Sequence, residues 1–265
     1  MNSQILVSII TPCFNSEKTI ARTFEAMIRQ TYQKIEYIVI DGGSTDGTLE
    51  IIREYEKKFP FLFRYVSEPD KGIYDAMNKG IRMATGKLIG IVNSDDYYAD
   101  DAIKNIVDAY DGADYRILYG FQRNIKEGQE TQIFINHHSQ LQYMMITHPT
   151  CFVTKNIYND FGVYDTTYRS SSDYEFMDRI YHQIPDCFVP VYHVISNFEE
   201  GGMSSTQLGV RETLKIKMKR GYISKFRYVM SCLYSRLVEV VQWFKRMAKS
   251  LNRTINGEKD VRSDL

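Results

Sequence analysis

The chain has 265 residues, of which 43% are apolar and 25% charged, a composition typical of a soluble globular protein with one large domain or two small ones. Its 33 basic and 33 acidic residues cancel overall. Residues 211–265, however, hold 14 basic and 5 acidic residues, a net charge of +9, which leaves −9 on the rest of the chain. This asymmetry predicts a basic segment that meets an anionic surface, and the acidic remainder argues against nucleic acid as the partner.

The cysteine pattern favours a reducing compartment. Cys13, Cys151, Cys187 and Cys232 are scattered, without the close pairs of a zinc site or a disulfide framework. The N-terminus lacks a basic leader, and no run approaches the ~20 apolar residues that span a bilayer. We therefore expect a cytoplasmic protein, which would act from the cytosolic face if it works at a membrane.

In chain order, the first hundred residues alternate between strand and helix patterns. The predicted strands cover Ile5–Thr11, Ile35–Asp41, Phe61–Glu68 and Lys87–Asn93. The predicted helices between them cover Ser16–Thr31, Ser44–Phe59 and Gly72–Thr85, with Ser16 as a plausible N-cap. Repeated β-α-β units of this length predict a parallel sheet with right-handed crossovers. After Asp101 the rhythm changes to shorter, mixed elements, which we expect to pack on the same sheet.

Polar clusters follow each of these strands: TPCFN, DGGSTDG, SEPDKG and NSDD. In open parallel sheets, ligands bind beyond the carboxyl ends of the strands. The paired carboxylates Asp95 and Asp96 suit Mg²⁺ or Mn²⁺ shared with substrate phosphates, although two aspartates before a helix also serve as caps. Asp41 ends its strand where a ligand would lie, whereas Asp46 fits a helix cap. The segment lacks the dinucleotide-binding and P-loop patterns.

Four segments taken together, VSIITPCFN, YIVIDGGSTDGT, EPDKGIYDAMNKGI and GKLIGIVNSDD, resemble the family 2 glycosyltransferases. The resemblance is close over about the first hundred residues, and the third segment looks most like bacterial transferases of the colanic-acid type. It implies a GT-A fold, with a Rossmann-like, mostly parallel sheet flanked by helices. It also implies a divalent metal and a nucleotide-diphosphate-sugar donor. We expect residues 1–205 to form the catalytic domain, with a nucleotide-sugar half (1–100) and an acceptor half (101–205), and residues 206–265 to form a helical extension.

The resemblance also implies roles for individual residues. Those that it places against the nucleotide-sugar are Thr11, Pro12, Phe14, Asp41, Lys71, Asp75 and Asp95. Asp41 would accept a hydrogen bond from the base N3–H, which fits a UDP- or dTDP-sugar. Asp96 would hold the metal on the diphosphate.

Inverting transfer requires a carboxylate that takes the proton of the acceptor hydroxyl. By resemblance, Asp173 in GVYDTTYRSSSDYEF stands at the position of this base. The residue before it, often acidic in the family, is Ser172, so Glu175 remains the alternative. An acid at a helix start is also favoured by the helix dipole alone. The chain lacks the Q-x-x-R-W pattern of processive relatives, which predicts transfer of a single sugar.

Apolar residues recur at spacings of three and four from Met230 to Leu251, among many basic residues. This helix could pack on the catalytic domain, form a homodimer seam or lie in the plane of an anionic membrane. The membrane interpretation is favoured, because it fits a polyprenyl-diphosphate-linked acceptor. The sequence therefore predicts a metal-dependent inverting glycosyltransferase of surface-polysaccharide assembly. A nucleotidyltransferase and a non-catalytic nucleotide-sugar-binding scaffold are the alternatives.

Overall fold

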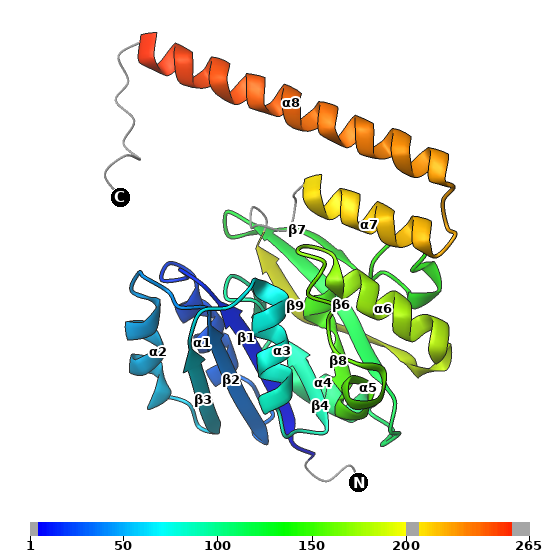
Figure 1. The fold of residues 1–265 in the computed structure, drawn as a ribbon. Coiled ribbons are helices and arrows are strands. Elements are labelled where there is room, and N and C mark those ends of the chain that lie inside the picture. Colours follow the sequence, from blue (N-terminus) through cyan, green and yellow to red (C-terminus); the bar gives the residue numbers. More distant parts are fainter. Residues whose placement is uncertain (1–4, 200–206, 256–265) are drawn as a thin grey trace. The chain divides into compact units, whose positions relative to one another are not determined.

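The computed structural model describes residues 5–199 and 207–255. Their contacts divide the chain into two compact units, Met1–Ser204 and Ser205–Leu265. The first unit contains a single nine-stranded sheet with helices on both faces, and the second consists of two helices (Figure 1).

The first half of the larger unit alternates strands and helices. Its strands are β1 (Val7–Cys13), β2 (Ile35–Asp41), β3 (Leu62–Ser67) and β4 (Leu88–Ile91), and its helices are α1 (Ile20–Ile28), α2 (Thr48–Glu56) and α3 (Ile73–Met83). The four strands pair in parallel in the order β3-β2-β1-β4. Helix α1 begins at Ile20 rather than at the predicted Ser16. The Ser16 side chain instead bonds to Ser94 Oγ at 2.8 Å, so it links two loops.

The second half completes the same sheet with mixed pairing. Its elements are β5 (Tyr97–Tyr98), α4 (Ala102–Ala109), β6 (Ile117–Lys126), β7 (Gln129–Phe134), β8 (Phe152–Thr154), α5 (Lys155–Phe161), α6 (Ser172–Gln183) and β9 (Phe188–Glu199), with short 3₁₀ turns at His138–Gln140, His148–Thr150 and Pro185–Cys187. β8 pairs antiparallel with β4 and β6, whereas β6 and β9 are parallel. The sheet is thus parallel from β1 to β4 and mixed beyond.

The curl of the sheet places β5 at its far edge. β5 follows β4 closely in the chain, yet it pairs with β9, and the full order is β3-β2-β1-β4-β8-β6-β9-β5 (Figure 1). The short connection from β4 to β5 carries Asp95 and Asp96. This acidic loop therefore lies between the parallel strands and the end of β9.

Successive side chains of β1 point to opposite faces of the sheet, which explains why helices cover both faces of the sheet. Ile9 belongs to the buried cluster that contains Phe24 of α1. Its neighbour Ile10 points the other way, toward α3, where a Cβ added to Gly80 would lie 2.4 Å from Ile10 Cγ2. The fully buried strand residues give β1 and β2 their continuous apolar pattern.

The smaller unit is a helical hairpin of α7 (Gln207–Lys219) and α8 (Lys225–Ile255). Ser235 of α8 is buried between the helices and donates to Gln207 Oε1 at 2.8 Å. Arg211 of α7 pairs with Glu239 of α8 at 2.8 Å. Among the described helices, none is both long enough and apolar enough to cross a bilayer.

Candidate active site

The loops that follow β1, β2 and β4 are tied together at one edge of the sheet. Asn15 N–H donates to Ser44 Oγ at 2.8 Å, and Asn15 Oδ1 accepts from Thr45 N–H at 2.9 Å. The Ser16–Ser94 bond adds the acidic loop. Asn15 itself adopts a positive φ of 48°, which asparagine tolerates better than most residues. The polar clusters that the sequence singles out thus do meet at the carboxyl ends of the parallel strands.

The three residues expected to line the base pocket differ in exposure. Thr11 is fully buried, with its hydroxyl 2.9 Å from Tyr37 OH, and Pro12 is buried beside it. Phe14, just beyond β1, exposes 59% of its surface. Of the three, only Phe14 offers a free aromatic face to a ligand, while Thr11 and Pro12 fix the end of the strand.

Asp41, expected to contact the base, is fully buried at the end of β2. Its Oδ2 accepts from Ser67 Oγ at 2.6 Å, and the carboxylate also accepts from the N–H and hydroxyl of Ser44. Both of its oxygens therefore have partners within the protein. Because Asp41 is fully buried, a base N3–H could bond to it only after a neighbouring group moves.

The adjacent acids Asp95 and Asp96 have different surroundings. Asp95 is half-buried, whereas Asp96 is 1% exposed. Asp96 Oδ1 accepts from Glu199 N–H at 3.2 Å, while its buried Oδ2 has no hydrogen-bond partner among the residues that the structure describes. Burial, helped by the charge of Asp95, raises the pKa of Asp96 well above its usual range. Asp95 is thus the more accessible of the two carboxylates, whereas Asp96, to which the resemblance assigns the metal, is enclosed.

Arg22 of α1 braces this acidic loop, a role that the sequence did not indicate. Its Nη2 donates to the Asp95 carbonyl at 2.8 Å, and its Nη1 pairs with Glu199 at 2.6 Å. The guanidinium also lies over the Tyr97 ring, 4.9 Å from the centroid. Helix α1 and the end of β9 therefore hold the loop from both sides.

Lys71 and Asp75 lie in a cavity of about 380 Å³ between the β3–α3 loop and the loop before α6. The cavity is lined by Asp70, Lys71, Gly72, Ile73, Tyr74, Asp75, Thr166, Tyr168 and Arg169. Asp75 accepts from Lys71 N–H at 3.1 Å, and Asp70 accepts from Gly72 N–H at 2.8 Å. Gly72 has a φ of 117°, a conformation that favours glycine at this turn.

Asp173 stands in the first turn of α6 and is 8% exposed. Its Oδ1 accepts from Tyr74 OH at 2.8 Å and from Tyr174 N–H at 2.9 Å. Glu175, the alternative base, pairs instead with Arg179 on its own helix at 3.1 Å. Tyr74 lines the cavity, so only this side chain separates Asp173 from the cavity. As a candidate base, Asp173 is therefore favoured over Glu175.

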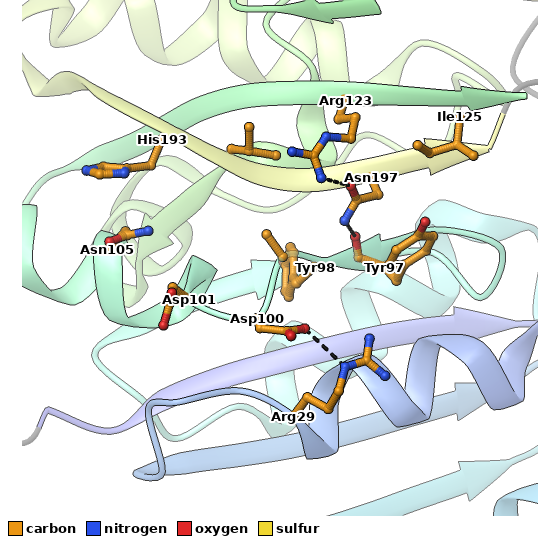
Figure 2. Close-up of a pocket in the computed structure, with 12 residues that line it drawn as sticks. Arg29, Tyr97, Tyr98, Asp100, Asp101, Asn105, Arg123, Ile125, His193 and Asn197 are labelled. Carbon is orange, nitrogen blue, oxygen red and sulfur yellow. Dashed lines mark hydrogen bonds and ion pairs between the residues drawn. The ribbon is translucent and has the colours of Figure 1, made fainter. Parts of the chain in front are cut away.

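A second groove, of about 440 Å³, lies between β5, the start of α4 and strands β6 and β9 (Figure 2). Its arginines have partners: Arg29 pairs with Asp100 at 3.1 Å, and Arg123 pairs with Glu130 at 2.9 Å and donates to Asn197 Oδ1 at 3.3 Å. His193 lines it as well. None of the residues predicted to bind the donor, the metal or the acceptor lines this groove.

The oxygen ligands at the acidic loop fit a divalent cation that takes most of its other ligands from water and substrate. Within residues 5–199 and 207–255, no three His, Cys, Asp or Glu side chains gather around one point. Asp95 and the unpartnered Asp96 Oδ2 supply hard oxygen donors. Mg²⁺ and Mn²⁺ suit such sites, since they keep several waters and share substrate phosphates.

Comparison with known proteins decides the family. Residues 8–182 match the family model described as Glycosyl transferase family 2. The chain belongs to glycosyl transferase family 2. Its glycosyltransferase relatives include a PGL/p-HBAD biosynthesis glycosyltransferase of Mycobacterium bovis, 28% identical over 76% of this chain and 80% of that one. The chondroitin synthase of Escherichia coli is 37% identical over 46% of this chain, but the match spans only 18% of that larger protein.

Solved structures of glycosyltransferases share the fold of this family 2 member. Staphylococcus aureus TarS, in a complex with UDP-GlcNAc, superposes with a TM-score of 0.65 at 18% identity, over 80% of this chain and 65% of that one. A Pyrobaculum calidifontis mannosyltransferase in complex with GDP-Man and Mn²⁺ gives 0.58 at 18% identity, over 87% and 68%. The curled sheet flanked by helices is therefore the GT-A fold. The family match and the glycosyltransferase relatives show that the protein is a glycosyltransferase.

Proposed function

We propose that this enzyme moves a single sugar, with inversion, from a UDP- or dTDP-sugar to a lipid-linked saccharide, in surface-polysaccharide assembly. The observation that carries the proposal is the placement of Asp173, a buried carboxylate at the start of α6 that is bonded to Tyr74 in the wall of the cavity. Neighbours of the same fold bind UDP-GlcNAc and GDP-Man, which supports a nucleotide-sugar donor.

In the proposed reaction, Phe14 stacks on the base and Asp41 accepts its N3–H, while Lys71 and Asp75 approach the nucleotide. The acceptor oxygen bonds to the anomeric carbon as the bond from that carbon to the diphosphate breaks. The acceptor proton passes to Asp173. Asp95, with Asp96 behind it, would hold Mg²⁺ or Mn²⁺, whose charge offsets that of the departing diphosphate. Arg22 and Glu199 keep the acidic loop in place for this role.

Donor hydrolysis and transfer test this proposal. Purified wild type should release UDP slowly from a matching UDP-sugar, and EDTA should suppress the release. Asp173→Asn should lower transfer by at least about 100-fold, the contribution typical of a general base. Glu175→Gln is the matched control, because Glu175 is engaged by Arg179. A wild-type rate in Asp173→Asn, or a retained anomeric configuration in the product, would refute the mechanism.

We also propose that α8 binds the cytosolic face of an anionic membrane. Its exposed apolar side chains fall within an arc of about 120° at 3.6 residues per turn. They are Phe226, Val229, Met230, Leu233, Leu237, Val240, Val241, Phe244 and Met247. Helix α7 contacts α8 through Ser235 and Glu239, which lie outside this arc. The arc is therefore not used within the hairpin.

The charges beside the arc favour lipid over a second copy of the helix. Exposed Arg227 and Lys245 follow one border of the arc, and exposed Lys225 and Arg236 follow the other. Two such helices packed arc to arc would bring like charges together. Near anionic lipid, by contrast, each basic residue contributes about 1 kcal/mol to binding. Trp243 and Tyr234, both exposed, stand near the two borders, where aromatic residues suit a membrane interface.

Vesicle sedimentation distinguishes binding of the arc to lipid from binding to a second copy of the helix. The full chain should bind vesicles that contain phosphatidylglycerol, bind phosphatidylcholine vesicles weakly, and release at high salt. Leu237→Asp, in the arc, should abolish this binding. Ser231→Asp, about 120° from Leu237 around the helix and outside the arc, adds the same charge as a control. A lipid-free dimer that Leu237→Asp dissociates would show that the arc is a dimer seam instead.

A further inference from the structure

We infer that Tyr74 is the positioning residue of the base: it fixes Asp173 Oδ1 and so leaves Oδ2 to take the acceptor proton. The inference rests on the proposed function, in which Asp173 is the base, and it adds a residue from the opposite half of the catalytic unit. Tyr74 and Asp173 are 99 residues apart in the chain, and their side chains meet at 2.8 Å.

The two oxygens of Asp173 are not equivalent. Oδ1 accepts from both Tyr74 OH and Tyr174 N–H, at 2.8 and 2.9 Å. Two donors that approach one oxygen from different elements, α3 and α6, fix the rotation of the carboxylate. The Tyr174 amide alone leaves the side chain free to turn about that bond, so the Tyr74 hydroxyl supplies the second constraint.

Within residues 5–199 and 207–255, no hydrogen-bond donor contacts Oδ2. His148 Nδ1 lies 3.9 Å from it, beyond hydrogen-bond distance. Burial lowers the pKa of His148, against the opposing effect of the Asp173 charge, so the imidazole is neutral at pH 7. Burial raises the pKa values of Tyr74, Tyr164 and Cys151, which also sense the Asp173 charge, so these groups stay protonated. The four groups that sense the Asp173 charge are therefore neutral, and in the described part of the chain Oδ2 is the oxygen of Asp173 without a hydrogen-bond donor.

Tyr74 also links the base to the donor half. It stands in the first turn of α3, directly after the Asp70–Gly72 turn, and it lines the same cavity as Lys71 and Asp75. Helix α3 is fastened to the other half a second time, because Asn78 bonds both the N–H and the carbonyl of Tyr164, at 3.0 and 2.9 Å. Because Tyr74 belongs to the segment that lines the cavity, its hydroxyl ties the position of that segment to the orientation of Asp173.

The test compares transfer with donor hydrolysis in Tyr74→Phe, which keeps the ring and removes the hydroxyl. We expect kcat for transfer to fall by about 10- to 100-fold, since misplacing a catalytic group by about 1 Å costs up to about 100-fold. The KM for the donor should stay unchanged. Hydrolysis should fall less than transfer, because a water molecule tolerates a misaligned base better than a bound saccharide does. Tyr158→Phe removes a buried hydroxyl that bonds Tyr164 rather than Asp173, and it controls for lost packing.

A second pair of variants separates the hydrogen bond from the ring. Tyr74→Gln retains a donor, whereas Tyr74→Leu is of similar size and has none. Transfer by the Gln variant should exceed transfer by the Leu variant severalfold at equal melting temperature. If Tyr74→Phe transfers sugar like wild type while Asp173→Asn is inactive, the positioning role is wrong and the proposed function stands. If Asp173→Asn is active, the proposed function itself fails.

Discussion

Asp95 and Asp96 are adjacent in the chain but have opposite environments: Asp96 is enclosed with one oxygen on Glu199 N–H, while Asp95 is half-buried. Sequence resemblance assigns the metal to Asp96 and the ribose or donor sugar to Asp95. We propose that Asp95 is the main protein ligand of the metal, because a cation shared with a diphosphate needs a carboxylate that substrate can approach. Asp96 is better placed to anchor the end of β9.

We therefore predict that Asp95→Ala lowers kcat/KM by at least about 100-fold and removes the response to Mn²⁺, with an unchanged melting temperature. Asp96→Ala should instead lower the free energy of unfolding by about 1–3 kcal/mol, because Glu199 N–H loses its acceptor. Metal titration of activity and thermal unfolding measure the two effects. The opposite pattern, with lost metal response at full stability in Asp96→Ala alone, would restore the assignment from resemblance.

Phe14 should contribute to donor affinity without contributing to stability, because 59% of its surface is exposed beyond β1. Phe14→Ala should raise the Kd for UDP by about tenfold, the range for loss of one base–aromatic stack. Isothermal titration calorimetry measures this change. Leu62→Ala is the control: Leu62 is 53% exposed but starts β3, at the opposite end of the strands. Equal UDP affinity in both variants would remove Phe14 from the base pocket.

Glu36 should make folding sensitive to acid. Its burial raises the pKa, but hydrogen bonds from Ser8 and Thr85 and the charge of Arg64 outweigh burial, so the net shift is downward. A lowered folded pKa stabilises the protein above the unfolded value of about 4.3, and the stabilisation is lost as pH falls through the folded value.

Glu36→Gln should accordingly lower the free energy of unfolding by about 2–3 kcal/mol at pH 7 relative to wild type. This difference from wild type should shrink below about pH 4. Denaturant unfolding at several pH values measures this. Glu54→Gln, which removes an exposed pair with Lys58, should change little. A deficit that is constant from pH 7 to pH 3 would contradict the charge-based explanation.

Gly80 should tolerate no side chain, because an added Cβ would lie 2.4 Å from Ile10 Cγ2 across the α3–β1 contact. Alanine gains about 1 kcal/mol in helix propensity, but overpacking costs about 1–3 kcal/mol, so we expect a net loss of up to about 2 kcal/mol. Thermal unfolding measures it against Arg82→Ala on the exposed side of α3. A more stable Gly80→Ala would mean that α3 can shift on the sheet.

The local patterns predicted the repeating part of the fold well. Continuous apolar runs gave the four parallel strands, and the 3.6-residue period gave α1 to α3, because both patterns report burial along one element. Ser16 shows the limit of such patterns. A serine before an apolar helix resembles a cap, yet its hydroxyl bonds Ser94, and a partner 78 residues away leaves no local signal.

By itself, the sequence determined the family, the GT-A fold, the convergence of polar loops at the strand ends and the basic character of the C-terminal helix. Only the tertiary structure decided which of two adjacent aspartates is enclosed, that Glu175 is engaged by Arg179, and that Tyr74 holds Asp173. The reason is physical. Strand and helix formation depend on the order of residues along one element, whereas enclosure and hydrogen-bond partners depend on which distant elements the curled sheet brings together.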